Sequence, residues 1–190
     1  MTTAAPKRAD ARRNIEAIVD AATRLLAVDP DASINDIAKA AGVGRVTLYG
    51  HFDSRAALIA EVTRRAVEHT EAALAEVDLE GEADAALGRL LEATWRLTYR
   101  YGALVVAAEQ VLPVEQMHSI HDAPAARVAR LLHRGRADGV FRDDQPVAWQ
   151  LSAVQSVLHG AATAVHRGEI TAEQAPGLVR ATVLAALRRV

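Results

Sequence analysis

The chain has 190 residues, of which 51% are hydrophobic, so it is long enough to bury a core as one domain or as two small ones. Its 22 Lys and Arg are balanced by 24 Asp and Glu, and the net charge of −2 argues against a protein that coats nucleic acid unspecifically. The sequence contains no cysteine, which excludes disulfides, thiol catalysis and Cys-ligated metal centres. The polar, basic start lacks the apolar stretch of a secretory signal, and no apolar run is long enough to span a membrane, so we expect a cytoplasmic protein.

Apolar residues recur at helical spacing along the whole chain, which predicts an all-α protein of about nine helices. The first helix is expected over residues 10–27 and ends before Pro30, because proline disfavours a helical conformation in the residue ahead of it. Ser33 is a suitable N-cap for a short second helix, with Asp36 in the capping-box position, and Gly42 ends that helix. The remaining helices are expected over residues 45–51, 54–77, 87–101, 103–112, 124–137, 146–166 and 171–189, with a shorter piece over residues 114–120.

The segment from Ser33 to Phe52 has the pattern of a helix-turn-helix, two short helices joined by a glycine turn. Ala41 and Gly42 at the turn are small, which allows the two backbones to approach each other, and we expect that only small residues fit there. The apolar side that holds the two helices together consists of Ile37, Ala38, Val43, Leu48 and Phe52.

The outward side of the second short helix presents hydrogen-bond donors and no carboxylate, namely Arg45, Thr47, Tyr49 and His51. Such a surface suits phosphates and base edges, because a recognition helix enters the major groove of DNA with its N-terminal residues toward the bases.

At these residues the chain resembles the TetR family of transcriptional regulators. The resemblance rests on Asp36-Ile37-Ala38, Ala41-Gly42-Val43, Thr47-Leu48-Tyr49, His51-Phe52 and Ser54-Arg55, in the order and spacing of the family's DNA-binding head, and it covers about the first quarter of the chain. It implies that Tyr49, His51 and Arg55 bind phosphates, whereas Arg45 and Thr47 approach bases or nearby phosphates. Lys39 completes the DNA-binding set predicted for the head.

Three positions depart from the family pattern. Gly44 stands where a serine or threonine commonly caps the recognition helix, a replacement that costs only a few tenths of a kcal/mol. Val46 replaces a frequent glycine or alanine, and it either alters a base contact or packs against the head. Gly50 is expected inside the recognition helix, where it costs about 0.5–1 kcal/mol relative to alanine.

Four basic residues, Lys7, Arg8, Arg12 and Arg13, fall within seven positions just before the first predicted helix or at its start. Such a run is either a solvated tail or an arm that reaches a minor groove or flanking phosphates. Because a helix-turn-helix follows in the sequence, both the solvated tail and the DNA-contacting arm stay open as interpretations.

We expect a DNA-binding domain over residues 1–55 and a helical ligand-binding and dimerisation domain over residues 56–190. In the TetR family the last two helices of each subunit form a four-helix dimer interface, although a purely intramolecular bundle would also explain two apolar helices. The predicted interface consists of a coiled-coil-like seam on the helix over residues 146–166 and of the apolar side of the last helix. Its residues are Val147, Leu151, Val154, Leu158, Ala161, Val179, Val183 and Ala186. A second, small-residue face of the same seam helix holds Ser152, Ser156, Gly160 and Thr163.

The central helices are expected to enclose an apolar ligand pocket with a few polar groups. Candidate ligand contacts are Trp95, Tyr99, Glu109, Gln110, Met117, His118, His121, Trp149, Gln155 and His159. Tryptophans at such positions are more often core fillers, and His159 on a helix seam is more often an interface histidine. His118 and His121 have the spacing of a metal pair beside Asp122, but the sequence supplies no third firm ligand, so we expect neither a metal nor a cofactor.

The resemblance implies a one-component repressor that binds palindromic operator DNA as a homodimer and is released by a small molecule. The fourth helix, over residues 54–77, would connect the ligand pocket with the DNA-binding head. A transcriptional activator on the same fold is one alternative, and a helical ligand-binding or interaction protein without sequence-specific DNA binding is another. We do not expect an enzyme, since the sequence offers no convincing nucleophile–base pair or paired catalytic carboxylates.

Overall fold

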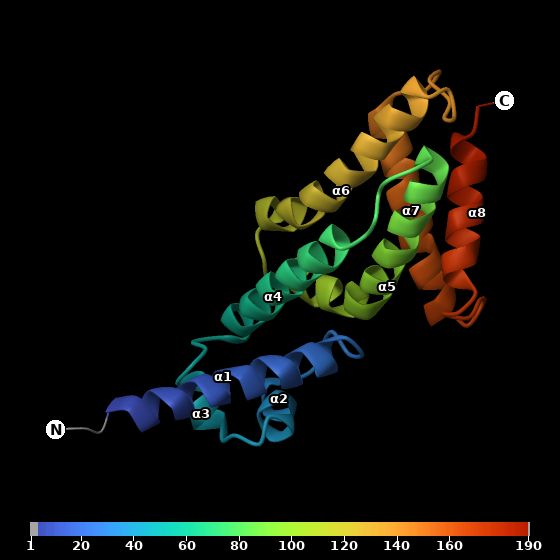
Figure 1. Ribbon diagram of the computed structural model, residues 1–190. Helices are drawn as coiled ribbons and strands as arrows, with labels where there is room; N and C mark the ends of the chain where they lie inside the picture. The colour runs from blue at the N-terminus through green and yellow to red at the C-terminus, as the bar shows by residue number, and fades with distance from the viewer. Residues whose placement is uncertain (1–3, 190) are drawn as a thin grey trace. The chain divides into compact units, whose positions relative to one another are not determined.

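The computed structural model describes residues 4–189, and it describes the side chains of all of these except residues 4–9 and 118–121. The described chain is α-helical, and its β-structure is limited to an isolated antiparallel bridge between Phe141 and Arg188. The helices in Figure 1 are α1 (Ala4–Leu26), α2 (Ile34–Ala40), α3 (Arg45–Tyr49), α4 (Arg55–Ala75), α5 (Ala83–Glu109), α6 (Val114–Ala137), α7 (Val147–His166) and α8 (Ala175–Leu187). The predicted all-α fold is confirmed.

Several predicted boundaries need correction. Helix α1 begins at Ala4, earlier than residue 10, because proline is tolerated in a first helical turn and Pro6 therefore does not exclude one. Two predicted breaks are absent, since Gly102 lies inside α5 and Pro124 lies inside α6. Glycine weakens a helix without ending it, and a proline removes one backbone hydrogen bond that the packing of a long helix can offset.

The described helices divide into two compact units. The first unit holds residues 1–68 and 101–117, and the second holds residues 69–100 and 118–190. Helices α4, α5 and α6 each contribute to both units. The predicted division into DNA-binding and ligand-binding domains at residue 55 is a functional one and stays a prediction.

The second unit has a core of aliphatic side chains around two aromatic ones, Trp95 and Phe141, which are 2% and 0% exposed. Helices α7 and α8 pack side by side in opposite directions, as Figure 1 shows. The buried Gln150 amide fixes the loop before α7: its Oε1 accepts a hydrogen bond from Arg136 at 2.9 Å, and its Nε2 donates to the Arg142 carbonyl at 3.2 Å. This amide is thus a buried polar group with both of its ends satisfied.

The end of α6 accommodates the Phe141 ring through the missing side chain of Gly135. A Cβ atom at residue 135 would lie 2.2 Å from Cδ2 of that ring. The Gly135 carbonyl also accepts the backbone N–H groups of Val140 and Phe141, at 2.8 and 2.9 Å. The chain therefore folds back over this glycine and places a buried aromatic ring against its backbone.

No helix in the part of the chain that the structure describes is both long and apolar enough to cross a membrane.

Replacing Gly135 with alanine is expected to destabilise the protein by about 1–3 kcal/mol, because the new methyl group displaces a fully buried ring. Gly102→Ala is the matched control, since a Cβ at residue 102 in α5 meets nothing within 4 Å and helix propensity then favours alanine by up to about 1 kcal/mol. Urea unfolding of both variants measures the two changes. Equal stabilisation by both substitutions would contradict the described packing of Phe141.

Candidate nucleic-acid interface and ligand cavity

The first unit holds the helix-turn-helix, with α2 capped at its N-terminus as predicted. The Ser33 hydroxyl accepts the Asp36 backbone N–H at 3.2 Å and donates to the Asp36 carboxylate at 2.5 Å. Ile34, Ile37 and Ala38 of α2 are buried. Capping and burial together hold a helix of seven residues that is too short to be stable alone.

Gly42 gives the turn between α2 and α3 its backbone conformation. Its φ of +71° lies in the left-handed region, yet a Cβ atom at this residue would meet nothing within 4 Å. The expectation that close backbone approach requires a small residue at 42 is therefore wrong. Glycine is favoured here because side chains rarely adopt this φ.

The recognition helix α3 places one side in the core and the other in solvent. Leu48 is 0% exposed and Phe52, just beyond the helix, is buried, whereas Arg45 and Tyr49 are exposed. The Arg45 guanidinium carbon lies 5.4 Å from the centroid of the Tyr49 ring, a cation–π contact between two predicted DNA-binding residues. Thr47 and His51 are half-buried. The structure thus brings Arg45 and Tyr49 together on an exposed surface and leaves the other two partly covered.

The two glycines that flank α3 serve as its caps. Gly44 is the N-cap, and it makes no side-chain hydrogen bond. Gly50 is the C-cap with φ −72° and ψ −14°, so the prediction that it lies inside the recognition helix is wrong. The helix ends at Tyr49, because the backbone N–H of His51 bonds to the Leu48 carbonyl three residues back, the pattern of a tightened last turn.

Arg55, the predicted phosphate ligand at the start of α4, has a role within the head. Its Nη2 donates a hydrogen bond to the Pro30 carbonyl at 2.6 Å, and the side chain is half-buried. This bond joins the start of α4 to the turn after α1. Removing the side chain would therefore disturb the head as well as remove a cation.

The remaining predicted DNA-binding residues lie on α1 and α2. Lys39 and Arg12 are exposed, and Arg13 forms an ion pair with Asp10 on the surface of α1. The side chains of Lys7 and Arg8 lie outside the described residues, but their backbone belongs to α1.

Sequence reasoning left Val46 open between a base contact and packing, and it did not include this residue in the site. The side chain is 87% exposed, which excludes packing against the head. The signal was present in the sequence, because residues 46 and 48 are about 200° apart on a helix and an inward Leu48 requires an outward Val46.

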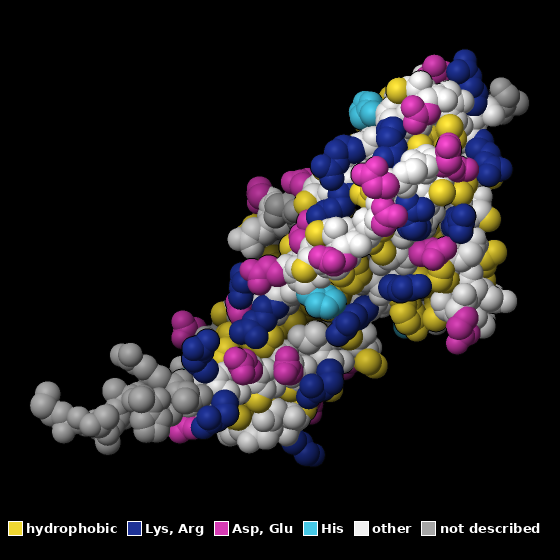
Figure 2. Space-filling model, in the orientation of Figure 1, with side chains coloured by type: hydrophobic (Ala, Val, Ile, Leu, Met, Phe, Trp, Pro, Cys, Tyr) yellow, Lys and Arg dark blue, Asp and Glu magenta, His cyan; other side chains and the backbone are white. Residues whose placement is uncertain are grey.

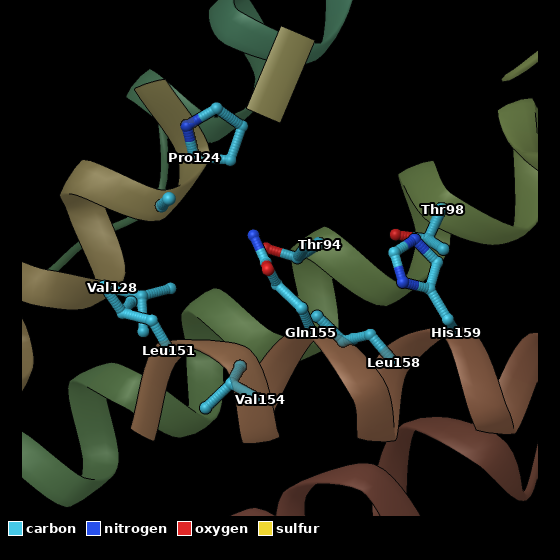
Figure 3. Close-up of a pocket in the computed structure, with 10 residues that line it drawn as sticks. Thr94, Thr98, Pro124, Val128, Leu151, Val154, Gln155, Leu158 and His159 are labelled. Atoms are coloured by element: carbon cyan, nitrogen blue, oxygen red, sulfur yellow. The ribbon is translucent and has the colours of Figure 1, made fainter. Parts of the chain in front are cut away.

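The second unit contains a cavity of about 70 Å³ between α5, α6 and α7 (Figure 3). In Figure 3 the amide of Gln155 extends from α7 toward this space. The Thr94 hydroxyl, also in the wall, donates to the Leu90 carbonyl at 2.8 Å. The lining residues are Thr94, Thr98, Pro124, Ala125, Val128, Leu151, Val154, Gln155, Leu158 and His159.

Two of the predicted ligand contacts, Gln155 and His159, line this cavity. Trp95 is a core residue that stacks on Tyr99, with ring centroids 5.7 Å apart, and Trp149 is 62% exposed on α7. Three further candidates, Glu109, Gln110 and Met117, belong to the first unit and do not line the cavity. The threonines of α5 were missed as ligand contacts, although their four-residue spacing places them on one helix face.

The side chains of His118 and His121 lie outside the described residues. Among the residues that are described, no group of three or more His, Asp or Glu is placed to hold a metal ion.

Figure 2 shows basic and acidic side chains interspersed over the visible face.

The predicted dimer seam faces mainly inward. Val154, Leu158, Val179 and Val183 are buried in the core of the second unit, and Val147, Leu151 and Ala161 pack against that core. Only Ala186 of the predicted set is exposed. The seam prediction is therefore wrong for the four buried residues, because the chain's own helices α5 and α6 already supply an apolar partner for that side.

The exposed sides of α7 and α8 carry small residues and two large apolar ones. Trp149 and Leu178 are 62% and 48% exposed. The exposed small residues are Ala148, Ser152, Ser156, Gly160 and Thr163 on α7 and Gly177, Ala181, Thr182, Ala185 and Ala186 on α8. These twelve residues are called the α7/α8 outer face below.

Comparisons with known proteins agree with this architecture. Residues 18–62 match the family model described as bacterial regulatory proteins, tetR family. The chain is 30% identical over 141 residues to the HTH-type transcriptional repressor LfrR of Mycolicibacterium smegmatis. The aligned residues cover 72% of this chain and 71% of that protein.

Solved structures share the fold over nearly the whole chain. The LfrR structure in complex with proflavine has a TM-score of 0.74 at 24% identity and covers 94% of this chain and 98% of that one. A putative transcriptional regulator from Saccharomonospora viridis in complex with choline has a TM-score of 0.79 at 21% identity, with 93% and 98% covered. The chain belongs to the TetR family of bacterial transcriptional regulators.

Proposed function

We propose that this transcriptional regulator represses its target genes as a homodimer that binds two operator half-sites and is released by a small molecule. The observation that carries the proposal is the exposed pair of Arg45 and Tyr49 on a recognition helix that is anchored by the fully buried Leu48. A cation and a phenol at this place suit phosphates and base edges of the major groove. The repressor name of the M. smegmatis relative supports the direction of regulation.

Within this proposal, Arg12, Lys39, Tyr49 and His51 bind the DNA backbone, and Arg45 and Thr47 approach bases. The net charge of −2 makes a specific surface necessary, since the whole chain has no electrostatic excess for DNA. Arg55 acts first by holding the head together through Pro30, so we assign it a positioning role beside any phosphate contact.

DNA binding is measured by fluorescence anisotropy with the fragment upstream of the protein's own gene and with scrambled DNA of equal length, at two salt concentrations. We expect at least tenfold preference for the native fragment at the higher salt. Tyr49→Phe should weaken binding to both DNAs about tenfold, because it removes a hydrogen bond to a charged phosphate. Tyr99→Phe, at a 51% exposed tyrosine of the second unit, should leave both affinities unchanged. Equal binding of both DNAs at high salt would contradict sequence-specific regulation by this fragment.

The α7/α8 outer face is the proposed contact with the second copy. Its small side chains allow close approach of helices, and Trp149 and Leu178 supply the large apolar area that interfaces concentrate. The hydroxyls of Ser152 and Thr163 donate to backbone carbonyls of their own helix, each at 3.1 Å. Their burial in an interface therefore leaves no unsatisfied donor. A two-fold dimer uses the same surface on both copies, as two related half-sites require.

Ala181→Arg should convert the dimer into monomers, because it places two buried charges at the centre of the α8 contact. Light scattering after gel filtration should change from twice the chain mass of 20.3 kDa to that mass. Ala72→Arg, at an exposed alanine of α4, is the matched control and should remain dimeric. A dimer that survives Ala181→Arg would place the interface elsewhere.

The cavity of the second unit is the proposed inducer site, and its walls favour a compact neutral ligand. The described lining consists of six apolar residues, two threonines, Gln155 and His159, without a carboxylate or a Trp, Tyr or Phe ring. A cationic group in such walls would lose hydration without gaining a counter-charge or an aromatic face. We therefore expect this site to differ from that of the S. viridis regulator, which was solved with choline.

Choline and 3,3-dimethylbutan-1-ol test this expectation, because they share shape and hydroxyl and differ in the charge of the bulky end. The alcohol should raise the melting temperature of the protein and weaken DNA binding, and choline at the same concentration should do neither. Ala125→Phe should abolish the response by filling the cavity, whereas Ala126→Phe, which changes an exposed neighbour outside the lining, should keep it. A response to choline alone, or to neither compound, would contradict a neutral ligand at this site.

The proposed coupling from cavity to head runs through α4. Glu71 of α4 and Arg127 of α6 form an ion pair at 2.7 Å, with side chains 31% and 15% exposed. Arg127 directly precedes Val128, which lines the cavity, and α4 continues to Arg55 at the edge of the head. A ligand that binds more tightly when α6 is in one of two positions would thereby shift the equilibrium between the corresponding positions of α4.

Two alternatives, activation and loss of sequence-specific DNA binding, predict different outcomes in these tests. Activation would follow from an operator placed to recruit polymerase, and reporter expression with and without the regulator separates it from repression. The relatives are transcriptional regulators, and the absence of enzymatic activity and the cytoplasmic location stay predictions.

A further inference from the structure

The most exposed apolar side chain on the recognition helix is that of Val46. It is 87% exposed, two positions from Leu48, which is 0% exposed. The isopropyl group therefore contributes no burial to the head. A β-branched residue is also a weaker helix former than the alanine that would fit the same place. Folding of the head thus gives no reason for valine at residue 46.

Exposure alone assigns no role, because single exposed apolar side chains are ordinary on protein surfaces. Val28 shows this, since it is 85% exposed in the turn that follows α1. The position of Val46 is what differs. It lies three residues from Tyr49 on the same helix face, and Tyr49 in turn holds the Arg45 guanidinium over its ring. Val46 thus forms one outward patch with a cation and a phenol.

The major groove of DNA offers such a patch one apolar group at its base edges, the 5-methyl group of thymine. We propose that Val46 reads a thymine in each operator half-site by contact between its isopropyl group and that methyl group. Arg45 and Tyr49 supply polar contacts beside it, which fix the helix in the groove without selecting this base. The assignment rests on the proposed DNA-binding role of α3 and adds the residue that determines specificity at one base pair.

The experiment uses the full-length protein and an operator obtained by in vitro selection from random duplex DNA. Each thymine of the operator is replaced singly by deoxyuridine, which pairs identically and lacks only the 5-methyl group. For the wild type, one such replacement in each half-site should weaken binding about threefold to tenfold, the value of one methyl group removed from water and packed. The salt dependence of binding should stay unchanged, because no charge is altered.

Val46→Ala should abolish this sensitivity, so that thymine and deoxyuridine operators bind equally. Val28→Ala is the matched control at an equally exposed valine of the same unit, and it should retain the full wild-type ratio. Both variants should keep the wild-type melting temperature, since neither side chain is packed. An unchanged thymine-to-deoxyuridine ratio in Val46→Ala would overturn the proposal, as would a wild type that is indifferent to every replacement. Failure to select any sequence would overturn sequence-specific DNA binding itself, which separates the two results.

Discussion

The burial of Leu48 is the interaction on which the DNA-binding surface depends. A helix of five residues has no stability of its own, because nucleation costs more than its few hydrogen bonds return. The recognition helix persists because one side is packed into the head, with Leu48 at 0% exposure and Phe52 beyond it. That single anchor also fixes the rotation of the helix, so it decides that Arg45, Val46 and Tyr49 face solvent.

The cap chemistry of the head agrees with this anchoring. Ser33 and Asp36 start α2 with reciprocal hydrogen bonds, and Gly42 supplies the left-handed turn that leads to α3. Gly44 caps α3 without a side-chain bond. The recognition helix is thus more weakly capped than α2, and its order relies more on tertiary packing than on local interactions.

In the second unit, helix α7 has apolar or small residues on both its inward and its outward side. The inward side, including Val154 and Leu158, fills the core and lines the cavity. The outward side is small and carries Trp149. The proposed ligand cavity and the proposed subunit contact therefore lie on opposite sides of one helix.

The sequence by itself determined the helix-turn-helix, the N-caps of its two helices and the all-α class, because these follow from local periodicity and from residues such as Ser33 and Gly42 that act within a few positions. The orientation of Val46 also follows from the position of Leu48. Which side of α7 faces the core was decided only in the tertiary structure, because an apolar seam satisfies an intramolecular partner and a second subunit equally well. The cavity likewise joins Thr94, Val128 and Gln155 from three helices, and the break predicted before Pro124 disappears within a continuous α6. These features depend on which helices meet, and helical periodicity carries no information about the partner.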